Sequence, residues 1–451
     1  MVPQSDSRVL GHRSPIASRT AEDGAFMATR VLFLTQWFEP EPSQRGLVPL
    51  ITALKARGHQ IEVATGFPNY PTGRIMPGYR LRPYQREMME DIVVHRVFLY
   101  PSHSRSSLGR SLNYLSFFFS ALVFCLARAR RFDLVYVYHP PITTPLAAAL
   151  SGLVTRRPYL LEVQDLWPDS VAATGMAGTG WMAKVLDPIC RLVYRRAGLV
   201  FGQSARMTEA LVARGVGPAR ARTLYNWADE EHARAGGTFD VGPLGFEGRF
   251  NFVFGGNLGA VQGLDVVVRA AARAAEIVPR IQLTIIGDGL ERAALEQLVS
   301  ELGTSHVRIH PALPRSEIGD VFATADVLVL HIVDQPLFEI TVPSKTQFYM
   351  AMGRPVLAAI KGEARDIIVS AAAGVAADPG NVEAIAAAMV EMAQMPRDVL
   401  DRMGENARRA YLERFSFATA VATIADAIDG IANDRTDGAV RRRSPDRYED
   451  A

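Results

Sequence analysis

The chain has 451 residues, of which 48% are hydrophobic and 21% are charged, and this balance predicts a globular protein of two or three domains. Its formal net charge is +2, and it contains two cysteines, Cys125 and Cys190. These values exclude a disulfide framework and a structural zinc site of cysteines, and they give no reason to expect a nucleic-acid partner.

The small net charge conceals two halves of opposite sign. Residues 27–230 hold 24 Lys and Arg against 14 Asp and Glu, whereas residues 231–451 hold 22 against 30. A positive first half suits an anionic partner, such as a membrane surface or a phosphorylated acceptor. An Arg-rich composition without functional meaning is the alternative.

The first half begins with a polar extension and continues as an α/β pattern. Residues 1–26 contain no apolar segment, so they do not form a secretory signal peptide, and we expect them to be disordered. Strands and helices then alternate, which is typical of a parallel α/β domain at residues 27–235. The predicted strands are 31–35, 61–65, 134–138, 159–163 and 199–202, and the predicted helices are 46–57 and 181–196.

The run Tyr114–Ala127 is apolar and has arginines on both sides, among them Arg110 and Arg128. It is shorter than the roughly 20 residues that a membrane-spanning helix needs. Two interpretations remain open: a helix that lies in a bilayer surface, and a crossover helix buried against the sheet. The basic first half favours the former, so we expect a cytoplasmic protein peripheral to the inner membrane.

Polar residues follow the ends of two predicted strands in this domain. Asp165 comes after strand 159–163, and His139 comes after strand 134–138. The carboxyl ends of parallel strands line the ligand crevice of such a sheet. Asp165 can therefore accept a hydrogen bond from a sugar hydroxyl or position an acceptor, although a turn or helix cap also explains it. His139 and Trp167 are candidate acceptor-side residues, and Asp229 is interpreted as a cap near the hinge.

A glycine-rich stretch near residues 230–248 separates a second α/β pattern from the first. The fold class is therefore α/β, with two doubly wound domains that face each other across a cleft. We place the second domain at residues 236–410, expect a helix at 411–433 that packs back on the first domain, and expect a disordered tail at 434–451. The predicted strands are 251–256, 281–287, 307–309, 327–330 and 356–360.

Two glycine-rich turns follow strands of this second domain. Glycines between a strand and a helix allow backbone N–H groups to approach a phosphate closely, although tight turns alone also need them. The second turn is expected to shape the cleft wall. The residues concerned are Gly255, Gly256, Asn257 and Gly259, with Gln262 nearby, and Gly287, Asp288 and Gly289.

The segment Pro343–Val356 predicts a turn, a helix and a strand entry. Pro343 suits the first turn of a helix, and Ser344 can cap its free N–H groups. Gly353 ends the helix. Free N–H groups and the dipole at a helix start favour an anion, and Lys345 adds a formal positive charge there. This segment therefore predicts a diphosphate site, as a nucleotide sugar would require.

Several catalytic motifs are absent from the sequence. It has no Asp-x-Asp pair to hold a metal-bound sugar diphosphate, and no His/Cys cluster with zinc spacing. It also lacks a P-loop, a Gly-x-Ser-x-Gly elbow and a dinucleotide-binding Gly-x-Gly-x-x-Gly after the first strand. We therefore expect no metal and no cofactor.

Taken together, these segments resemble a family. Gly255–Gly263, Gly287–Gly289 and Pro343–Pro355 resemble the family 4 glycosyltransferases of the GT-B type. Segments of the first domain are similar to the WbuB-like subgroup, which includes amino-sugar transferases of bacterial surface polysaccharides. Those segments are Trp37–Glu41, Arg57–His59, Gly66–Gly73, Pro101–His103 and Asp165–Pro168. The resemblance covers about residues 29–432.

The resemblance implies a retaining, metal-independent hexosyltransferase. It would move an N-acetylated amino or deoxy sugar from a nucleotide-diphosphate donor to a lipid-linked or polysaccharide acceptor, as in O-antigen synthesis. Asp165, Glu339 and Lys345 are then the candidate catalytic residues. The candidate donor-binding residues are Gly255, Gly256, Asn257, Gly259, Gln262, Gly287, Asp288, Gly289, Ser344, Lys345 and Gln347.

Two departures from the family pattern concern the donor. Family 4 enzymes usually carry two glutamates eight positions apart, and Ile340 and Phe348 stand at those positions here. Glu339 and Gln347 have the same spacing one residue earlier, so Gln347 is a candidate ribose contact. Two other functions remain open: a nucleotide-sugar 2-epimerase of the same architecture, which needs no acceptor, and a non-catalytic nucleotide-sugar binding protein.

Overall fold

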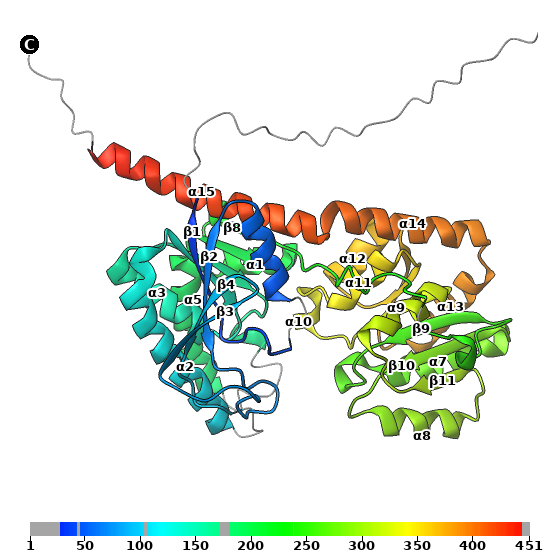
Figure 1. Ribbon diagram of the computed structural model, residues 1–451. Coiled ribbons are helices and arrows are strands. Elements are labelled where there is room, and N and C mark those ends of the chain that lie inside the picture. The colour runs from blue at the N-terminus through cyan, green and yellow to red at the C-terminus, as the bar shows by residue number, and fades with distance from the viewer. Residues whose placement is uncertain (1–27, 43–45, 103–106, 171–179, 238, 444–451) are drawn as a thin grey trace, which may run out of the picture.

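The computed structural model describes residues 28–42, 46–102, 107–170, 180–237 and 239–443. Two α/β lobes lie side by side, and a long helical segment runs along both of them (Figure 1). Each lobe is a mainly parallel sheet with helices on both faces. The predicted fold class, two doubly wound α/β domains, is therefore confirmed.

The first domain is built on an eight-stranded sheet in the order β3-β4-β2-β1-β5-β6-β7-β8. All neighbouring strands pair in parallel except β3 and β4. Continuous apolar runs form most of these strands, as expected when both faces are covered. Their bounds are β1 Arg30–Leu34, β2 Gln60–Gly66, β3 Tyr84–Met89, β4 Ile92–Val97, β5 Leu134–His139, β6 Tyr159–Val163, β7 Leu199–Gly202 and β8 Ala221–Thr223.

Helices cover both faces of this sheet. One face packs on α2, α3, α5 and α6, and the other packs on α1 and on the C-terminal helix α15. The predicted helix 46–57 is observed at 47–56, and the predicted helix 181–196 begins one residue earlier. The bounds are α1 Leu47–Ala56, α2 Ser107–Arg128, α3 Thr143–Thr155, α5 Gly180–Arg196 and α6 Ala205–Ala213.

The second domain has a six-stranded parallel sheet in the order β11-β10-β9-β12-β13-β14. Its two cores contain α7, α8 and α13 on one face and α9, α11, α12 and α14 on the other. The strands are β9 Phe250–Gly255, β10 Ile281–Ile286, β11 Val307–His310, β12 Val327–His331, β13 Val356–Ala359 and β14 Gly374–Ala377. The helices are α7 Leu264–Ile277, α8 Arg292–Leu302, α9 Arg315–Thr324, α10 Pro336–Glu339, α11 Ser344–Met352, α12 Glu363–Ser370 and α13 Val382–Gln394.

The chain returns to the first domain through α14 (Arg397–Arg414) and α15 (Phe417–Arg443) (Figure 1). Residues of α15 between Ala420 and Ile428 are buried in the core of the first domain. The sequence predicts a disordered tail from residue 434, whereas α15 continues to Arg443. The extension 1–26 and residues 444–451 lie outside the described residues.

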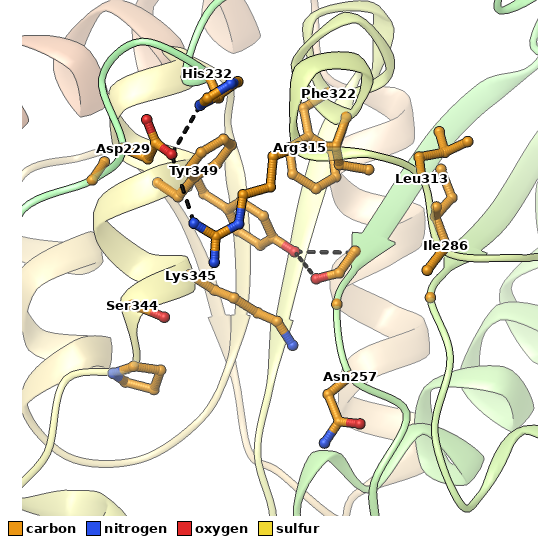
Figure 2. Close-up of a pocket in the computed structure, with 18 of the residues that line it drawn as sticks. Asp229, His232, Asn257, Ile286, Leu313, Arg315, Phe322, Ser344, Lys345 and Tyr349 are labelled. Atoms are coloured by element: carbon orange, nitrogen blue, oxygen red, sulfur yellow. Dashed lines mark hydrogen bonds and ion pairs between the residues drawn. The ribbon is translucent and has the colours of Figure 1, made fainter. Parts of the chain in front are cut away.

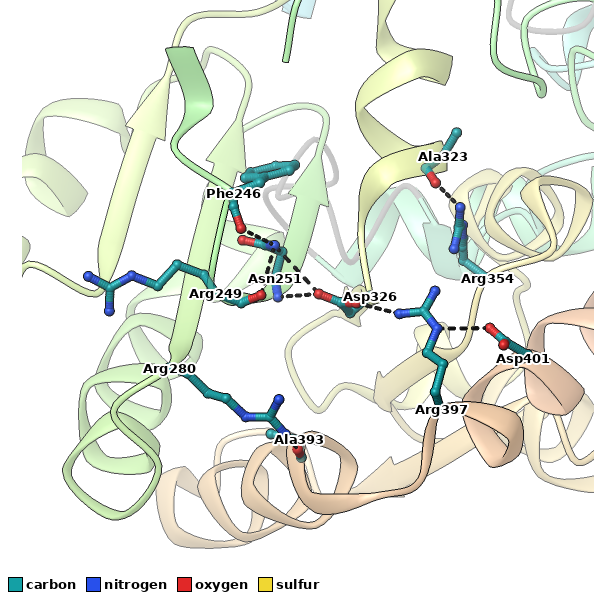
Figure 3. A network of polar contacts seen from close by, with 10 residues as sticks. All are labelled: Phe246, Arg249, Asn251, Arg280, Ala323, Asp326, Arg354, Ala393, Arg397 and Asp401. Carbon is teal, nitrogen blue, oxygen red and sulfur yellow. Dashed lines mark hydrogen bonds and ion pairs between the residues drawn. The ribbon is translucent and has the colours of Figure 1, made fainter. Parts of the chain in front are cut away.

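Polar contacts attach α14 to the sheet of its own domain (Figure 3). Asp326 accepts a hydrogen bond from the backbone N–H of Asn251 at 2.8 Å and one from Arg397 at 2.7 Å. Arg397 also donates to Asp401 at 3.0 Å. Because Asp326 meets both the sheet and the helix, it fixes the start of α14 before the chain crosses between the domains.

The two domains also contact each other through Glu363. Its carboxylate accepts hydrogen bonds from the backbone N–H groups of Ala205 and Arg206 at the start of α6, and from the Tyr225 hydroxyl, at 2.7–2.8 Å. A carboxylate at a helix start satisfies free N–H groups and meets the positive end of the dipole. Glu363 therefore joins the second domain to the first.

One face of helix α2 is exposed in the described part of the chain. Six apolar side chains at spacings of three and four residues are each at least 40% exposed: Leu108, Leu112, Leu115, Phe119, Val123 and Leu126. Two helical segments in the described part of the chain, Leu108–Arg131 and Arg397–Asn433, are long and apolar enough to cross a membrane by length and composition. About two fifths of each apolar window is buried inside the protein. Helix α2 is therefore amphipathic, with its inner face against the sheet.

Candidate active site

A cavity of about 660 Å³ lies at the carboxyl ends of the strands of the second domain. It is lined by the turns after β9 and β10, by α9 and the segment that leads into it, by the start of α11, and by the linker between the domains (Figure 2). Eight of the candidate donor-binding residues line it: Gly255, Gly256, Asn257, Gln262, Gly287, Asp288, Ser344 and Lys345. The patterns singled out in the sequence therefore meet in one place.

Lys345 extends from the first turn of α11 into this cavity (Figure 2). Its Nζ donates to Gln262 Oε1 at 2.6 Å and lies 3.9 Å from the centre of the Phe254 ring. Burial lowers the pKa of Lys345 to about 7, because few groups replace the water that would solvate its charge. An anion bound beside Nζ would favour the charged form, so this lysine is suited to a phosphate ligand.

Two glycines bring the backbone close to Lys345. A Cβ atom at Gly256, where φ is +137°, would lie 2.6 Å from Lys345 Cε. A Cβ atom at Gly287 would lie 1.9 Å from the carbonyl oxygen of Gly256. No side chain larger than hydrogen fits at either position without a shift. The two turns therefore form a wall of bare backbone on which a ligand can lie.

The start of α11 differs from the expectation in one respect. Pro343 occupies the N-cap position, where its side chain makes no capping hydrogen bond, and Ser344 is the first helical residue. The prediction that Ser344 caps the helix is therefore wrong, because the cap is the residue before the first helical residue, and Ser344 already belongs to the helix. The uncapped helix start contributes partial positive charge beside Lys345.

Three further donor-side candidates are not among the cavity-lining residues. Gly259 and Gly289 belong to the two turns but do not line the cavity. Gln347 lies two residues after Lys345, roughly opposite it on α11. Its side chain is 1% exposed, and neither amide atom has a hydrogen-bond partner among the residues that the structure describes. Phe348, by contrast, lines the cavity and packs edge to face on Phe322.

The acceptor-side candidates lie in the first domain, outside this cavity. His139 is fully buried at the end of β5, and burial lowers its pKa to about 3, so the ring is neutral. It packs edge to face on Trp167 at 6.0 Å. His139 was expected to line the crevice at the end of its strand, and the structure places it there with its side chain buried. Asp165 remains solvent-exposed after β6, and the protein atoms crowded around it raise its pKa.

Glu339 lies at the end of α10, at the contact between the domains. Its carboxylate is 3.7 Å from Arg206 of α6. The neighbouring Ile340 carbonyl accepts a hydrogen bond from Ser204 at 2.5 Å. The structure therefore places Glu339 against the first domain, whereas Lys345 lies in the cavity of the second.

The structure adds a polar cluster that the sequence did not reveal. Asp229 of the linker lies 2.9 Å from His232 Nδ1 and 3.9 Å from Arg315, which begins α9 (Figure 2). All three side chains line the cavity. Asp229 was interpreted as a cap, and only the packing of the linker against α9 shows that it also faces the cavity. The available signal in the sequence for the role of Asp229 was its position directly after Asn226-Trp227-Ala228, at the end of the first domain.

Among the described residues, no group of three or more His, Cys, Asp or Glu side chains has a geometry suited to a metal ion. The positive groups among the described lining residues are Lys345, Arg315 and the start of α11. This arrangement can hold a diphosphate and stabilise negative charge that develops on it.

Residues 43–227 match the family described as "Glycosyl transferase 4-like domain", and residues 241–410 match "Glycosyl transferases group 1". The chain is 27% identical to "Putative colanic acid biosynthesis glycosyl transferase WcaI" of Escherichia coli (strain K12), over 67% of this chain and 76% of that protein. It is 26% identical to "Probable glycosyltransferase WbjE" of Pseudomonas aeruginosa, over 68% and 79% respectively.

Solved structures share the fold. The crystal structure of HepE from Anabaena in complex with UDP aligns with a TM-score of 0.65 at 18% identity, over 90% of this chain and all of that one. The α,α-trehalose 6-phosphate synthase of Burkholderia multivorans aligns with a TM-score of 0.68 at 13% identity, over 94% of this chain and all of that one. At these identities the likeness shows the two-domain GT-B fold.

Proposed function

Because this chain belongs to the glycosyltransferases, as a 4-like domain followed by a group 1 domain, we propose that it moves a sugar from a nucleoside-diphosphate donor to an acceptor. The observation that carries the proposal is Lys345, buried in the cavity beside the uncapped start of α11. The leaving diphosphate gains negative charge in the transition state, and fixed donors at this place stabilise it.

The proposed transfer is retaining and needs neither a metal nor a cofactor. Lys345 and the helix start supply positive charge where a metal would otherwise act. The leaving phosphate oxygen takes the proton of the attacking acceptor hydroxyl as the old glycosidic bond breaks and the new one forms on the same face. In this scheme no separate general base is required, and Asp165 binds an acceptor hydroxyl across the cleft.

The proposed acceptor is a lipid-linked or polysaccharide saccharide, and the sugar is an amino or deoxy hexose. The name of the E. coli relative, which refers to colanic acid biosynthesis, supports a role in bacterial surface polysaccharides. The first-domain segments that are similar to the WbuB-like subgroup, including Asp165–Pro168, support an O-antigen type of product.

We further propose that the protein acts at the cytoplasmic face of the inner membrane through the exposed apolar face of α2. Vesicle cosedimentation tests this point. Phe119→Asp and Val123→Asp should each weaken vesicle binding several-fold, because a charge replaces a side chain that is 61% or 66% exposed. Leu290→Asp is the matched control, because Leu290 is 90% exposed on the second domain. Equal loss in all three variants would contradict the assignment of α2.

The transfer itself is tested with Lys345→Ala. Loss of one fixed donor should cost on the order of 2–4 kcal/mol of transition-state stabilisation, so turnover should fall at least tenfold while the variant stays folded. Lys361→Ala is the control, because Lys361 is an exposed lysine that pairs with Asp334. Unchanged turnover in folded Lys345→Ala would contradict the proposal.

The same assay separates the two competing functions. An epimerase would convert the donor sugar without any acceptor, whereas a binding protein would neither transfer nor hydrolyse the sugar. The fold alone does not decide, because "putative UDP-N-acetylglucosamine 2-epimerase from Listeria monocytogenes" also aligns, with a TM-score of 0.57 at 14% identity over 94% of this chain and all of that one. Product that appears only when acceptor is present supports the transferase.

A further inference from the structure

A second cavity, of about 330 Å³, lies in the first domain, near the amino ends of strands β1 and β2. Arg30 and Gln60, the first residues of β1 and β2, line it. The Lys345 cavity, in contrast, lies in the second domain, at the carboxyl ends of the strands of that domain. The second cavity therefore belongs to neither the donor site nor the proposed acceptor side.

Arginines from separate elements converge on this cavity: Arg30 from β1, Arg86 from β3, Arg128 from the end of α2, and Arg131 just after it. Arg30 is paired with Asp133 at 3.2 Å. Among the described residues, Arg86, Arg128 and Arg131 form no ion pair. The Arg128 guanidinium lies 5.8 Å from the centre of the Tyr84 ring, a contact that holds it without neutralising its charge.

Among the described residues that line the cavity, Glu62 is the one carboxylate, and it is paired with His95, which also lines the cavity. Its carboxylate lies 2.7 Å from His95 Nε2, and the other ring nitrogen of His95 contacts the Tyr84 hydroxyl at 2.8 Å. Burial lowers the pKa of His95, Glu62 opposes this, and the charges of Arg128 and Arg86 lower it further. The positive charge of the arginines is thus felt inside the cavity.

The end of a helix attracts cations, and this accounts for part of the cluster. The carboxyl end of α2 favours Arg128 and Arg131. It does not account for Arg86, which β3 contributes from the edge of the sheet, or for Arg30 of β1. Like charges that share one cavity repel each other, and a single carboxylate of the described lining residues, that of Glu62, lies among the arginines of this one.

We propose that this cavity binds a phosphoryl anion, either the phosphate of a lipid headgroup or a free or soluble phosphorylated compound. Guanidinium groups match phosphate oxygens in pairs, and the arginines come from several directions, as recognition of a tetrahedral anion requires. The site is separate from the Lys345 cavity and does not depend on the proposed transfer reaction.

The test uses the full-length chain and inorganic phosphate as the probe. Thermal stability is followed against phosphate for wild type, for the double variant Arg86→Gln/Arg131→Gln, and for the control Arg130→Gln. Arg130 is exposed and adjacent in sequence but does not line the cavity. The double variant should bind phosphate at least about tenfold more weakly, since it loses two charge-assisted contacts, whereas the control should match wild type.

A Lys345→Ala variant separates this site from the donor cavity, because its binding of phosphate at the arginines should persist. Equal stabilisation of the double variant and the control by phosphate would overturn the proposal, provided both are folded by circular dichroism.

Vesicles of phosphatidylcholine with and without phosphatidylglycerol then identify the source. If the double variant also loses its preference for anionic vesicles, the ligand is a headgroup; if it keeps that preference but no longer binds phosphate, the ligand is soluble.

Discussion

The protonation state of Lys345 should control nucleotide binding. Burial lowers its pKa to about 7, so at neutral pH the free protein holds a mixture of charged and neutral Lys345. A diphosphate needs the charged form, because only that form offers a positive Nζ. As the pH rises, an increasing fraction of the protein must take up a proton before it can bind.

The size of the effect follows from that pKa. The charged fraction falls from about one half at pH 7 to about 3% at pH 8.5. Apparent affinity scales with the competent fraction, so the dissociation constant should increase about 15-fold, or about 1.6 kcal/mol. The terminal phosphate of a nucleotide has a second pKa near 6, so its own charge changes little over this range.

Isothermal titration with uridine and guanosine diphosphate at pH 7 and pH 8.5 measures the effect. Lys345→Met removes the charge but keeps an unbranched apolar side chain of similar length, so its weaker binding should not change over this range. Lys361→Met should behave like wild type. If wild type and Lys345→Met show the same pH dependence, Lys345 does not contact the diphosphate.

Further outcomes concern stability. The pKa of Lys345 in the folded protein lies below its unfolded value of 10.5, so the unfolded chain binds more protons between pH 7 and 10. The free energy of unfolding, measured in urea, should therefore rise by about 2–3 kcal/mol from pH 7 to 9. Lys345→Met should not show this rise. Gly287→Ala should destabilise the second domain by about 3 kcal/mol in urea, because its Cβ would meet the carbonyl oxygen of Gly256 at 1.9 Å, whereas Gly430→Ala in α15, with open space around it, should be neutral or slightly stabilising. Glu363→Ala should lower the free energy of unfolding by about 2–3 kcal/mol, because it removes three hydrogen bonds across the domain contact. Glu383→Ala, which removes an exposed carboxylate, should lower it much less. Equal decreases in the two variants would contradict the role given to Glu363.

The sequence predicted the two α/β domains because local patterns determine them. Buried parallel strands are continuous apolar runs, such as Val31–Thr35, and they need no knowledge of their neighbours. The β3–β4 hairpin was missed because its edge strand is not such an apolar run. β3 is an edge strand of alternating exposed and partly buried residues, so Tyr84–Met89 carries a weak apolar signal, and Glu90 and Asp91 form its turn at positive φ.

The donor cavity was predictable where the chain is locally continuous. The glycine turns and the start of α11 are short motifs, and eight of their residues line one cavity. Contacts between distant segments were not predictable. Asp229 and Arg315 meet only because the linker packs beside α9, and His139 packs on Trp167, which lies on a different segment of the chain. The position of Gln347 could have been predicted, because the helical period places it on the side of α11 away from Lys345.

A crystal structure of the full chain with uridine or guanosine diphosphate tests the central claim most directly. The account predicts that the two phosphates lie beside Lys345 Nζ, between the start of α11 and the Gly255–Gly256 turn. Phosphates bound in the first domain, or a nucleotide in the cavity with its phosphates turned away from Lys345, would contradict it.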